Sequence, residues 1–342
     1  MGKQPVTSYD IAKAAGVSQS AVSRAFALDG AIATKTRQHI LEVARKLGYQ
    51  PNAIARSMST ARGGSRQKSG IVGVIVTRLQ DPFFARIIDL FSRNLQVKGW
   101  HMLLFSVENQ SEVDDALHAL MQYRIDGVIV LSAILSERMA ETCRKQGIPI
   151  VLYNRHAQNK SINSIRIDNI SGGRNAAEVL IEAGHERIAF VGGSLTDNTT
   201  SERELGFTER LTEAGRELLR REAGNYTFES GCESARRLLA RQERPDAIFC
   251  ASDVMALGVL HTARHDFHLN VPGDLSLVGF DDIPAASWPD HQLTTIRQPV
   301  ERMIREAVDT LIERMEDSSL TAKVSLFPGE LILRNTVRVI GT

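Results

Sequence analysis

Several features that define other protein classes are missing from this sequence of 342 residues. No run of apolar residues is long enough to cross a bilayer, and the opening stretch MGKQPVTSYD contains no apolar signal core. Cysteine is scarce, and Cys143, Cys232 and Cys250 are odd in number and far apart, which favours reduced, buried thiols over a disulfide framework or a zinc site. We therefore expect a cytoplasmic protein with no membrane span and no metal.

The sequence also lacks the motifs of common α/β enzymes. Its first strand-like run, IVGVIV, is followed by TRLQDPFF rather than by a glycine-rich dinucleotide loop, and neither a G-x-x-x-x-G-K-S/T phosphate loop nor a G-x-S-x-G nucleophile elbow occurs. His261 and His265 have the i, i+4 spacing of metal ligands on a helix, but HTARH lacks the glutamate of a zinc protease, so an exposed helix end is the preferred interpretation. These absences argue against catalysis and predict no cofactor.

What the sequence does have is an uneven distribution of charge under a formal net charge of +1. Residues 1–69 contain 11 Lys and Arg against 3 Asp and Glu, a balance of +8, whereas the rest of the chain carries 30 against 37, a balance of −7. A basic front of this kind indicates a polyanionic partner, although a solvated basic surface would have the same composition.

Three helical patterns fill residues 7–48. Thr7 is a suitable N-cap for the first helix, the second begins after Ser18, and Gly16 and Gly48 end the first and third with residues that tolerate positive φ. The third helix is expected from about residue 36 to residue 47, with a buried stripe of Ile40, Val43, Ala44 and Leu47. The polar side chains that the second helix turns away from its buried face are Gln19, Ser20, Ser23 and Arg24. Two short helices joined by a tight turn and braced by a third predict a helix-turn-helix module with its polar second helix in a major groove, while a plain three-helix bundle would show the same periodicity.

From Ile71 onward, buried strand patterns alternate with amphipathic helical stretches. The strand-like runs are IVGVIV, HMLLFS, DGVIVL, IPIVLY, RIAFVGG, DAIFCAS and DLSLVGF. This alternation predicts an α/β fold in which a helix-turn-helix head precedes a core of two doubly wound parallel-sheet subdomains, with a cleft at the C-terminal ends of the strands.

The runs VTSYDIAKAAGVSQSAVSRAF and TKTRQHILEVARKLGYQPNAIARSM closely resemble the DNA-binding head of LacI/GalR transcriptional regulators, from residue 5 to about residue 60. The resemblance implies that Gln19 and Ser20 read bases and that Arg24 is a fixed DNA contact. The positions that it assigns to backbone phosphates are Thr7, Tyr9, Ser18 and Ser23. The sequence departs from the family pattern at Ala21, where Thr is usual, and at Ala27, where Asn is usual. These two departures concern one phosphate contact rather than the docking of the head on DNA.

The segment PNAIARSMST is helical in pattern but barely two turns long, so it is too short to persist alone in water. The resemblance identifies it as the hinge helix, at about residues 52–60, which orders on DNA or against its copy in a dimer. Its expected DNA contacts are Asn52, Ala55 and Met58. Met58 stands where the family has an apolar wedge, usually Leu, between central base pairs, although it could instead pack against the protein body. Residues 61–69 form a Gly/Ser/basic linker.

The remainder of the chain resembles the effector domain of the same family, itself similar to periplasmic sugar-binding proteins, through DPFF, IDN, GHERIAFVGG, RELGF, ASDVMALGVL, VGFDDIP and LTTIRQP. The effector-binding residues implied by position are Phe83, Arg203, Asp253 and Asp281, with Tyr226 as an aromatic wall and Asn154, Arg155 and Asp168 nearer the edge. Carboxylates accept the hydrogens of sugar hydroxyls, an Arg fork donates to ring or carboxylate oxygens, and aromatic rings cover an apolar face. Each of these residues could also be a structural ion pair or a core ring.

The expected organisation is a head at 1–60 that includes the hinge helix, a linker at 61–69, and an effector-binding and dimerisation domain at 70–342. Its N-subdomain is expected at about 70–165 and 296–322, and its C-subdomain at about 166–293 and 324–340. Because the chain ends at LILRNTVRVIGT with no heptad repeat for a tetramer tail, a homodimer is expected, with the N-subdomain and the surroundings of Trp288 in its interface.

The favoured interpretation is a sequence-specific transcriptional regulator, a repressor, that binds a pseudo-palindromic double-stranded DNA operator. Its expected small-molecule effector is a sugar or sugar acid bound between the subdomains. A purine-like corepressor is the alternative, since Phe83 and Tyr226 could sandwich a flat base. A sugar receptor without DNA binding is disfavoured because the head has the helix-turn-helix pattern.

Overall fold

The computed structural model describes residues 6–26, 31–49, 68–131, 133, 135–156, 161–193 and 198–338. The chain divides into two compact units, Met1–Ser69 and Gly70–Thr342, which are described separately below. The expected hinge helix, with Asn52, Ala55 and Met58, lies outside the described residues. Among the residues that are described, no helix has the length and apolar character needed to span a bilayer.

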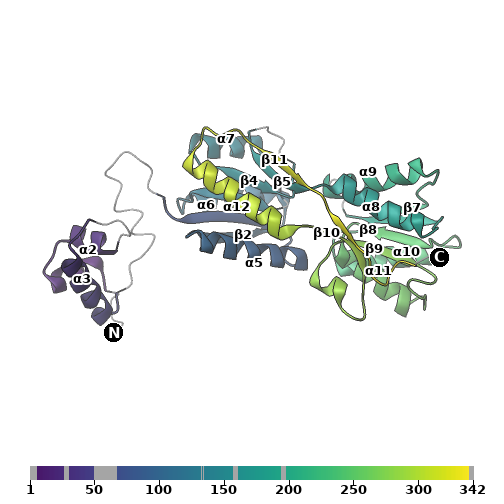
Figure 1. Cartoon of the computed structure of the whole chain (residues 1–342), viewed down its shortest axis with the longest axis horizontal. Coiled ribbons are helices and arrows are strands. Elements are labelled where there is room, and N and C mark those ends of the chain that lie inside the picture. The colour runs from purple at the N-terminus through teal and green to yellow at the C-terminus, as the bar shows by residue number, and fades with distance from the viewer. Residues whose placement is uncertain are drawn as a thin grey trace. The chain divides into compact units, whose positions relative to one another are not determined.

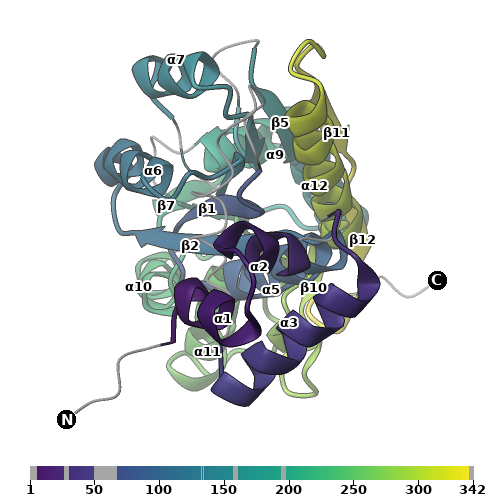
Figure 2. The same cartoon turned by 90° about the vertical axis from the view of Figure 1, so that its left-hand side faces the viewer.

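The described part of the first unit contains three helices, α1 (Ser8–Ala15), α2 (Gln19–Phe26) and α3 (Thr34–Leu47), which lie close together in Figure 2. The Thr7 hydroxyl accepts from the Asp10 N–H at 3.4 Å while the Asp10 carboxylate accepts from the Thr7 N–H at 2.8 Å, so the predicted N-cap is part of a reciprocal capping box. Gly16 and Gly48 end their helices at φ of 65° and 68°, as predicted.

Packing among the three helices depends on a small apolar core. Ile11, Val22 and Ile40 are almost completely buried, and α3 adds Ala44. The predicted stripe is wrong at Leu47, which is 43% exposed, because the end of α3 turns that position away from the core formed with α1 and α2. The residues left outside this core determine what the head presents to a partner.

The second unit contains a first parallel sheet in the order β11-β5-β4-β3-β1-β2. Its strands are β1 (Ile71–Thr77), β2 (His101–Val107), β3 (Gly127–Leu131), β4 (Ile150–Tyr153), β5 (Asn163–Ile167) and β11 (Val324–Phe327). One face is covered by α5 (Pro82–Val97) and α12 (Val300–Glu316), and the other packs against α6 (Val113–Met121) and α7 (Glu137–Lys145). Consecutive residues of β3 belong to the cores on opposite faces, which explains why both faces read as apolar in the sequence.

A second sheet has the order β12-β10-β9-β8-β6-β7 and is parallel except for β12, which runs antiparallel to β10. Its strands are β6 (Ile188–Gly192), β7 (Arg220–Ala223), β8 (Ala247–Cys250), β9 (Ser276–Asp281), β10 (Thr294–Arg297) and β12 (Glu330–Ile332). The helix pairs α8 (Asn169–Glu182) with α9 (Asn198–Glu213), and α10 (Phe228–Leu239) with α11 (Asp253–His265), pack against it (Figure 1). The two doubly wound sheets confirm the predicted α/β class.

Within the described residues, the chain passes between the two sheets three times, from β5 to α8, from β10 to α12 and from β11 to β12. The Asp168 N–H donates to the Phe327 carbonyl at 2.7 Å and joins the first crossing to the third. The subdomain boundary expected at residue 324 needs correction, because Val324–Phe327 pairs in parallel with β5 and belongs to the first sheet. The second subdomain resumes only with β12.

Candidate functional site

The outer face of α2 presents polar side chains to solvent. Gln19, Ser20 and Arg24 are exposed, and Ser23 is half-buried, whereas Val22 and Ala25 face the helical core. A helix whose apolar side is buried against the other helices and whose polar side is exposed has the form that inserts into a major groove. The structure therefore leaves the predicted base-reading positions accessible.

Local hydrogen bonds orient this polar face. Gln19 Nε2 donates to Ser8 Oγ at 3.2 Å, and Arg24 Nε donates to the Ser20 carbonyl at 3.3 Å. The hydroxyls of Ser18 and Ser20 lie 2.9 Å apart. These bonds are at exposed positions, so exchanging them for bonds to bases or phosphates removes no buried polar partner.

Two predicted phosphate contacts lie at the start of α1. The side chain of Tyr9 is 68% exposed, and the exposed Thr7 hydroxyl belongs to the capping box. The helix N-terminus there adds a partial positive charge to the basic composition of the unit. This combination suits contact with a polyanion.

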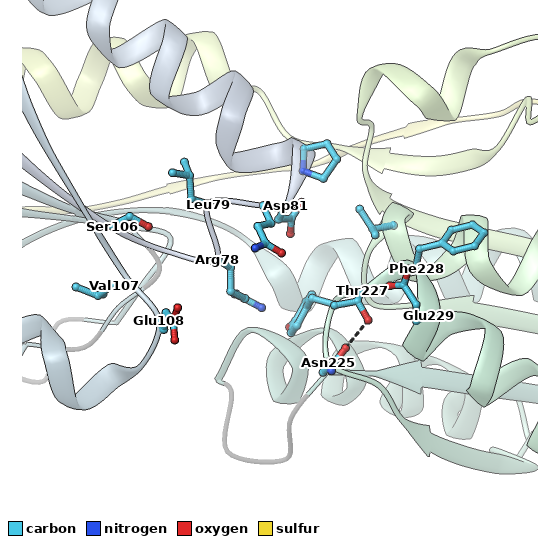
Figure 3. A pocket seen from close by; sticks show the side chains of 14 residues that line it. Arg78, Leu79, Asp81, Ser106, Val107, Glu108, Asn225, Thr227, Phe228 and Glu229 are labelled. Carbon is cyan, nitrogen blue, oxygen red and sulfur yellow. Dashed lines mark hydrogen bonds between the residues drawn. The ribbon is translucent and has the colours of Figure 1, made fainter.

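In the second unit, a cavity of about 620 Å³ opens between the carboxyl ends of strands from both sheets. Its lining, drawn in Figure 3, consists of Arg78, Leu79, Gln80, Asp81, Pro82, Ser106, Val107, Glu108, Asn225, Tyr226, Thr227, Phe228, Glu229 and Val254. Residues 78–82 follow β1 and residues 106–108 lie at the C-terminal end of β2 in the first sheet, whereas residues 225–229 follow β7 of the second. A ligand held here would contact both subdomains at once.

The two sides of the cavity meet through Arg78 and Tyr226. The guanidinium carbon of Arg78 lies 4.2 Å from the centre of the Tyr226 ring, a cation–π contact. The Tyr226 hydroxyl lies 2.6 Å from Thr200 Oγ1, which accepts the Gly193 N–H at 2.9 Å. A Cβ on Gly193 would come within 2.0 Å of the Tyr226 ring, so glycine is needed for the ring to sit there.

Among the eight predicted effector contacts, Tyr226 is the one that lines this cavity. Phe83 is only 7% exposed and packs edge-on against Phe84, at 5.4 Å between ring centres. Arg203 is 3% exposed, lies over the Phe280 ring and donates to Asn169 Oδ1 at 2.9 Å. Phe83 and Arg203 therefore support the walls of the site in this arrangement.

Arg203 and Asp281 form a buried ion pair, with 3.4 Å between Arg203 Nη2 and Asp281 Oδ1. Asp281 Oδ1 also accepts from Gln298 Nε2 at 2.7 Å, and Asn154 Nδ2 donates to Gln298 Oε1 at 3.0 Å. Burial raises the pKa of Asp281 to about 7, against the opposing effect of the Arg203 charge. The structure thus brings three predicted residues together through Gln298, which lies on the crossing from β10 to α12.

Asp253 is completely buried and does not reach the cavity surface. Its carboxylate accepts from Thr295 Oγ1 at 2.6 Å and from the Ile283 N–H at 2.9 Å. Burial, followed by the nearby Asp281 carboxylate, raises the pKa of Asp253 well above its usual value. These bonds fix the β9 and β10 ends rather than meeting a ligand directly.

The remaining predicted residues lie where the two subdomains meet. Asp168 caps α8 by accepting from the Ser171 N–H at 3.0 Å. Arg155 Nη1 donates to Thr199 Oγ1 at 3.2 Å and so links the loop after β4 to α9. Both positions are placed to respond when one sheet moves against the other.

Two family descriptions match the chain: "Bacterial regulatory proteins, lacI family" over residues 7–52 and "Periplasmic binding protein-like domain" over residues 177–337. The chain is 32% identical over 339 residues to catabolite control protein A of Priestia megaterium, with 97% of this chain and 99% of the relative covered. The chain belongs to the LacI family. It is a DNA-binding transcriptional regulator and not an enzyme, as the motif analysis predicted.

Solved structures of LacI-family proteins share its architecture. The lac repressor dimer bound to operator and the anti-inducer ONPF matches 98% of this chain and 100% of that chain, with a TM-score of 0.87 and 27% identity. The complex of the transcriptional regulator CelR with cellobiose matches 97% of this chain and 99% of that chain, with a TM-score of 0.72 and 29% identity. These likenesses confirm the resemblance drawn from the sequence motifs.

Sequence reasoning about this LacI-family chain missed most of the cavity lining. Arg78 lies within TRLQDPFF, a run from which the motif analysis excluded a dinucleotide loop and took DPFF, with Phe83, as a family landmark, without singling out Arg78. Asn225 and Thr227 flank the predicted Tyr226, and Ser106 ends a recognised strand-like run. The available signal was position, because polar residues just after parallel strands gather at one edge of a sheet.

Proposed function

We propose that this regulator is a repressor that binds a pseudo-palindromic operator as a homodimer and responds to a sugar or sugar acid bound between its subdomains. The observation that supports the effector class is the cavity of about 620 Å³, whose lining combines one Arg and three carboxylate side chains with Ser, Thr, Asn and Gln. Such groups match the hydroxyl-rich surface of a sugar. CelR, which is similar to this chain, forms a complex with cellobiose.

The DNA side of the proposal rests on the exposed polar face of α2 and the basic composition of the first unit. Gln19 and Ser20 are proposed to read base edges, Arg24 to contact the DNA, and Thr7, Tyr9, Ser18 and Ser23 to hold phosphates. The similar lac repressor is a dimer on its operator, and a symmetric dimer requires a pseudo-palindromic site. Asn52, Ala55 and Met58 remain proposed hinge contacts, and a cytoplasmic location accords with a role on DNA.

Packing around the cavity favours a sugar over a purine. The Tyr226 ring is only 8% exposed and has Arg78 stacked on it, while Phe83 is buried against Phe84. A flat base can be sandwiched between Phe83 and Tyr226 only after both rings change their neighbours. Binding hydroxyl groups along the polar lining needs no such rearrangement.

Operator titration with an effector panel tests this function. Fluorescence anisotropy would measure binding of the full chain to the operator from its own promoter and to a scrambled duplex, with and without each monosaccharide, disaccharide, sugar acid or purine base. We expect preference for the operator and a change in affinity of about 5- to 150-fold with a member of the sugar or sugar-acid classes, the usual range of allosteric coupling. A response to purine bases alone, or equal affinity for the scrambled duplex, would contradict the proposal.

A further inference from the structure

Arg78 is the one cationic side chain lining the cavity of the described second unit. Although Asp81, Glu108 and Glu229 line the same cavity, no hydrogen bond or ion pair joins the Arg78 guanidinium to another described residue. Its contacts are instead aromatic, at 4.2 Å from the Tyr226 ring centre and 5.8 Å from that of Phe84. Burial raises the pKa values of the Asp81 and Asp281 carboxyl groups and the Arg78 charge acts to lower them, but Arg78 forms no direct pair with either of these described residues. A guanidinium held in a cavity without a directly paired anion is a candidate for binding an anion from outside.

Stacking on Tyr226 prepares Arg78 for such a partner. A guanidinium lying over an aromatic face keeps its N–H groups in its own plane, where two of them can donate in parallel to the oxygens of a carboxylate. Thr200 holds the Tyr226 hydroxyl at 2.6 Å, so the platform under the guanidinium is itself fixed. Arg78 and Tyr226 both adopt left-handed backbone conformations, at φ of 57° and 66°, which are uncommon for residues other than glycine and tend to occur at ligand-binding positions.

The acidic side chains of the lining do not take this role. Asp81 caps α5 by accepting the Phe83 N–H at 3.0 Å, so one of its oxygens is already engaged. Burial raises the pKa of its carboxyl group, against the opposing effects of the Phe83 N–H and of the Arg78 charge, but no ion pair joins Asp81 to Arg78 in the described residues. Glu108 and Glu229 are exposed, where solvent and salt screen their charges. These acids still disfavour a phosphate, which carries up to two negative charges, more than a carboxylate, which carries one.

We propose that the effector carries a carboxylate group and that Arg78, stacked on Tyr226, binds it, so that the ligand is a sugar acid such as a uronate or an aldonate rather than a neutral sugar. This inference rests on the function proposed above. Ser106, Asn225 and Thr227 supply donors and acceptors for the hydroxyl groups of the same molecule. Arg78 follows β1 and Tyr226 follows β7, so the anchored carboxylate lies at the contact between the two subdomains.

Matched ligand pairs test the proposal directly. Calorimetry on the full chain would compare D-galacturonate with D-galactose, D-glucuronate with D-glucose, D-gluconate with D-glucitol, and D-glucose 6-phosphate with D-glucose. We expect at least one carboxylate to bind about tenfold or more tightly than its neutral partner, since charge-assisted bonds to a carboxylate are worth at least that factor. Tighter binding of the neutral partners or of the phosphate, or failure of every carboxylate to bind, would overturn the proposal.

Variants at Arg78 then identify the anchor. Arg78→Gln should reduce the affinity for the acid about tenfold or more and leave the affinity for the neutral partner nearly unchanged. Arg78→Lys should retain part of the preference for the acid, because Lys keeps the positive charge but lacks the paired N–H groups of the guanidinium. The matched control is Arg86→Gln, which removes an equal charge from α5, outside the cavity, where Arg86 pairs with Glu301 at 2.6 Å. Unchanged affinity of Arg78→Gln for the acid would show that the carboxylate binds elsewhere.

Operator titrations distinguish failure of this inference from failure of the proposed function. If a neutral sugar changes operator affinity in both the wild type and Arg78→Gln, the sugar-responsive regulator stands and the carboxylate anchor is wrong. If no sugar or sugar acid changes operator affinity, both are wrong. A response to an acid that Arg78→Gln abolishes and Arg86→Gln preserves supports both.

Discussion

Gln298 donates a 2.7 Å hydrogen bond to Asp281, and the two residues belong to different parts of the path between the subdomains. Asp281 ends β9 of the second sheet, whereas Gln298 lies on the crossing from β10 to α12 and also binds Asn154, which follows β4 of the first sheet. Gln298 is only 3% exposed. A change in the angle between the subdomains must therefore lengthen or replace these buried bonds. The Asp281 carboxylate is thereby coupled to the conformation of the crossing from β10 to α12.

The pH dependence of stability should change in Asp281→Asn. Because the folded-state pKa of Asp281 is about 7 and its ordinary value is 3.8, the native state keeps a proton that the unfolded state releases between these pH values. The free energy of unfolding should therefore fall as pH rises from about 4 to about 7, with a contribution from Asp281 of roughly 1–4 kcal/mol. Asp281→Asn cannot ionise and should remove that contribution.

Urea unfolding at a series of pH values measures this effect, and tryptophan fluorescence is a suitable signal because Trp100 and Trp288, the two tryptophans of the chain, both lie in the second unit. Asp89→Asn is the matched control, since Asp89 is exposed on α5 and pairs with Arg93. The assignment fails if Asp281→Asn and Asp89→Asn follow the wild-type pH profile equally. The buried bonds that Arg203 makes with Asn169 and Asp281 predict that Arg203→Ala lowers the free energy of unfolding, so Asp281→Asn is the cleaner variant for testing the ligand response.

Asp253→Ala should destabilise the second unit without removing a cavity-lining residue. The substitution leaves the Thr295 hydroxyl and the Ile283 N–H without their buried acceptor, at a cost of about 2–4 kcal/mol in the free energy of unfolding. Asp266→Ala, at the exposed C-terminal end of the same helix, should cost much less. Equal losses in urea unfolding would show that Asp253 has no special structural role.

Strong apolar strands were predictable from the sequence, but two short strands with polar residues were not. Apart from Thr77 at the end of β1, the strands β1, β3 and β6 are runs of Val, Ile, Leu, Phe, Ala and Gly buried on both faces, so composition alone indicates them. In contrast, β7 reads RREA and β10 reads TTIR, and neither four-residue run is apolar enough to stand out as a strand. They become strands because β6 and β9 offer them backbone partners, an effect of tertiary structure that no local pattern contains.

The candidate site was likewise predictable from the sequence only in part. The family resemblance pointed to Tyr226, Arg203 and Asp281, and the structure shows them in one region of the second unit. They did not indicate which of these side chains are covered, because burial of Arg203 depends on Phe280 and Asn169 from separate elements. The stacking of Arg78 on Tyr226 joins two sheets across a long separation in sequence, and periodicity carries no information on such a contact.

Arg24→Ala should weaken operator binding. Arg24 is exposed on α2, and its guanidinium makes only one bond within the described head, to the Ser20 carbonyl, so it is free to bond DNA. We expect a loss of about 1–3 kcal/mol in binding free energy, measured by fluorescence anisotropy at fixed salt. Arg93→Ala removes the same charge from α5 in the second unit and should leave operator affinity almost unchanged. Equal effects of the two substitutions would mean that Arg24 acts only through net charge.

Exchanging Gln19 and Ser20 should change which operator sequences are preferred rather than lower affinity uniformly. A Gln side chain can form two hydrogen bonds with the major-groove edge of adenine, whereas a Ser hydroxyl can form a hydrogen bond with any of several bases. Moving the Gln amide by one residue therefore moves the preferred base pair. Gln19 now donates to Ser8 across the helix-turn-helix, and Ser20 lies beside Ser18, so the exchange alters two exposed contacts and no core residue. Selection from duplexes with randomised half-sites, performed with the wild type and the double variant, measures the ranking of sequences. If the ranking stays the same while affinity falls, Gln19 and Ser20 hold the phosphate backbone and another part of the head reads the bases.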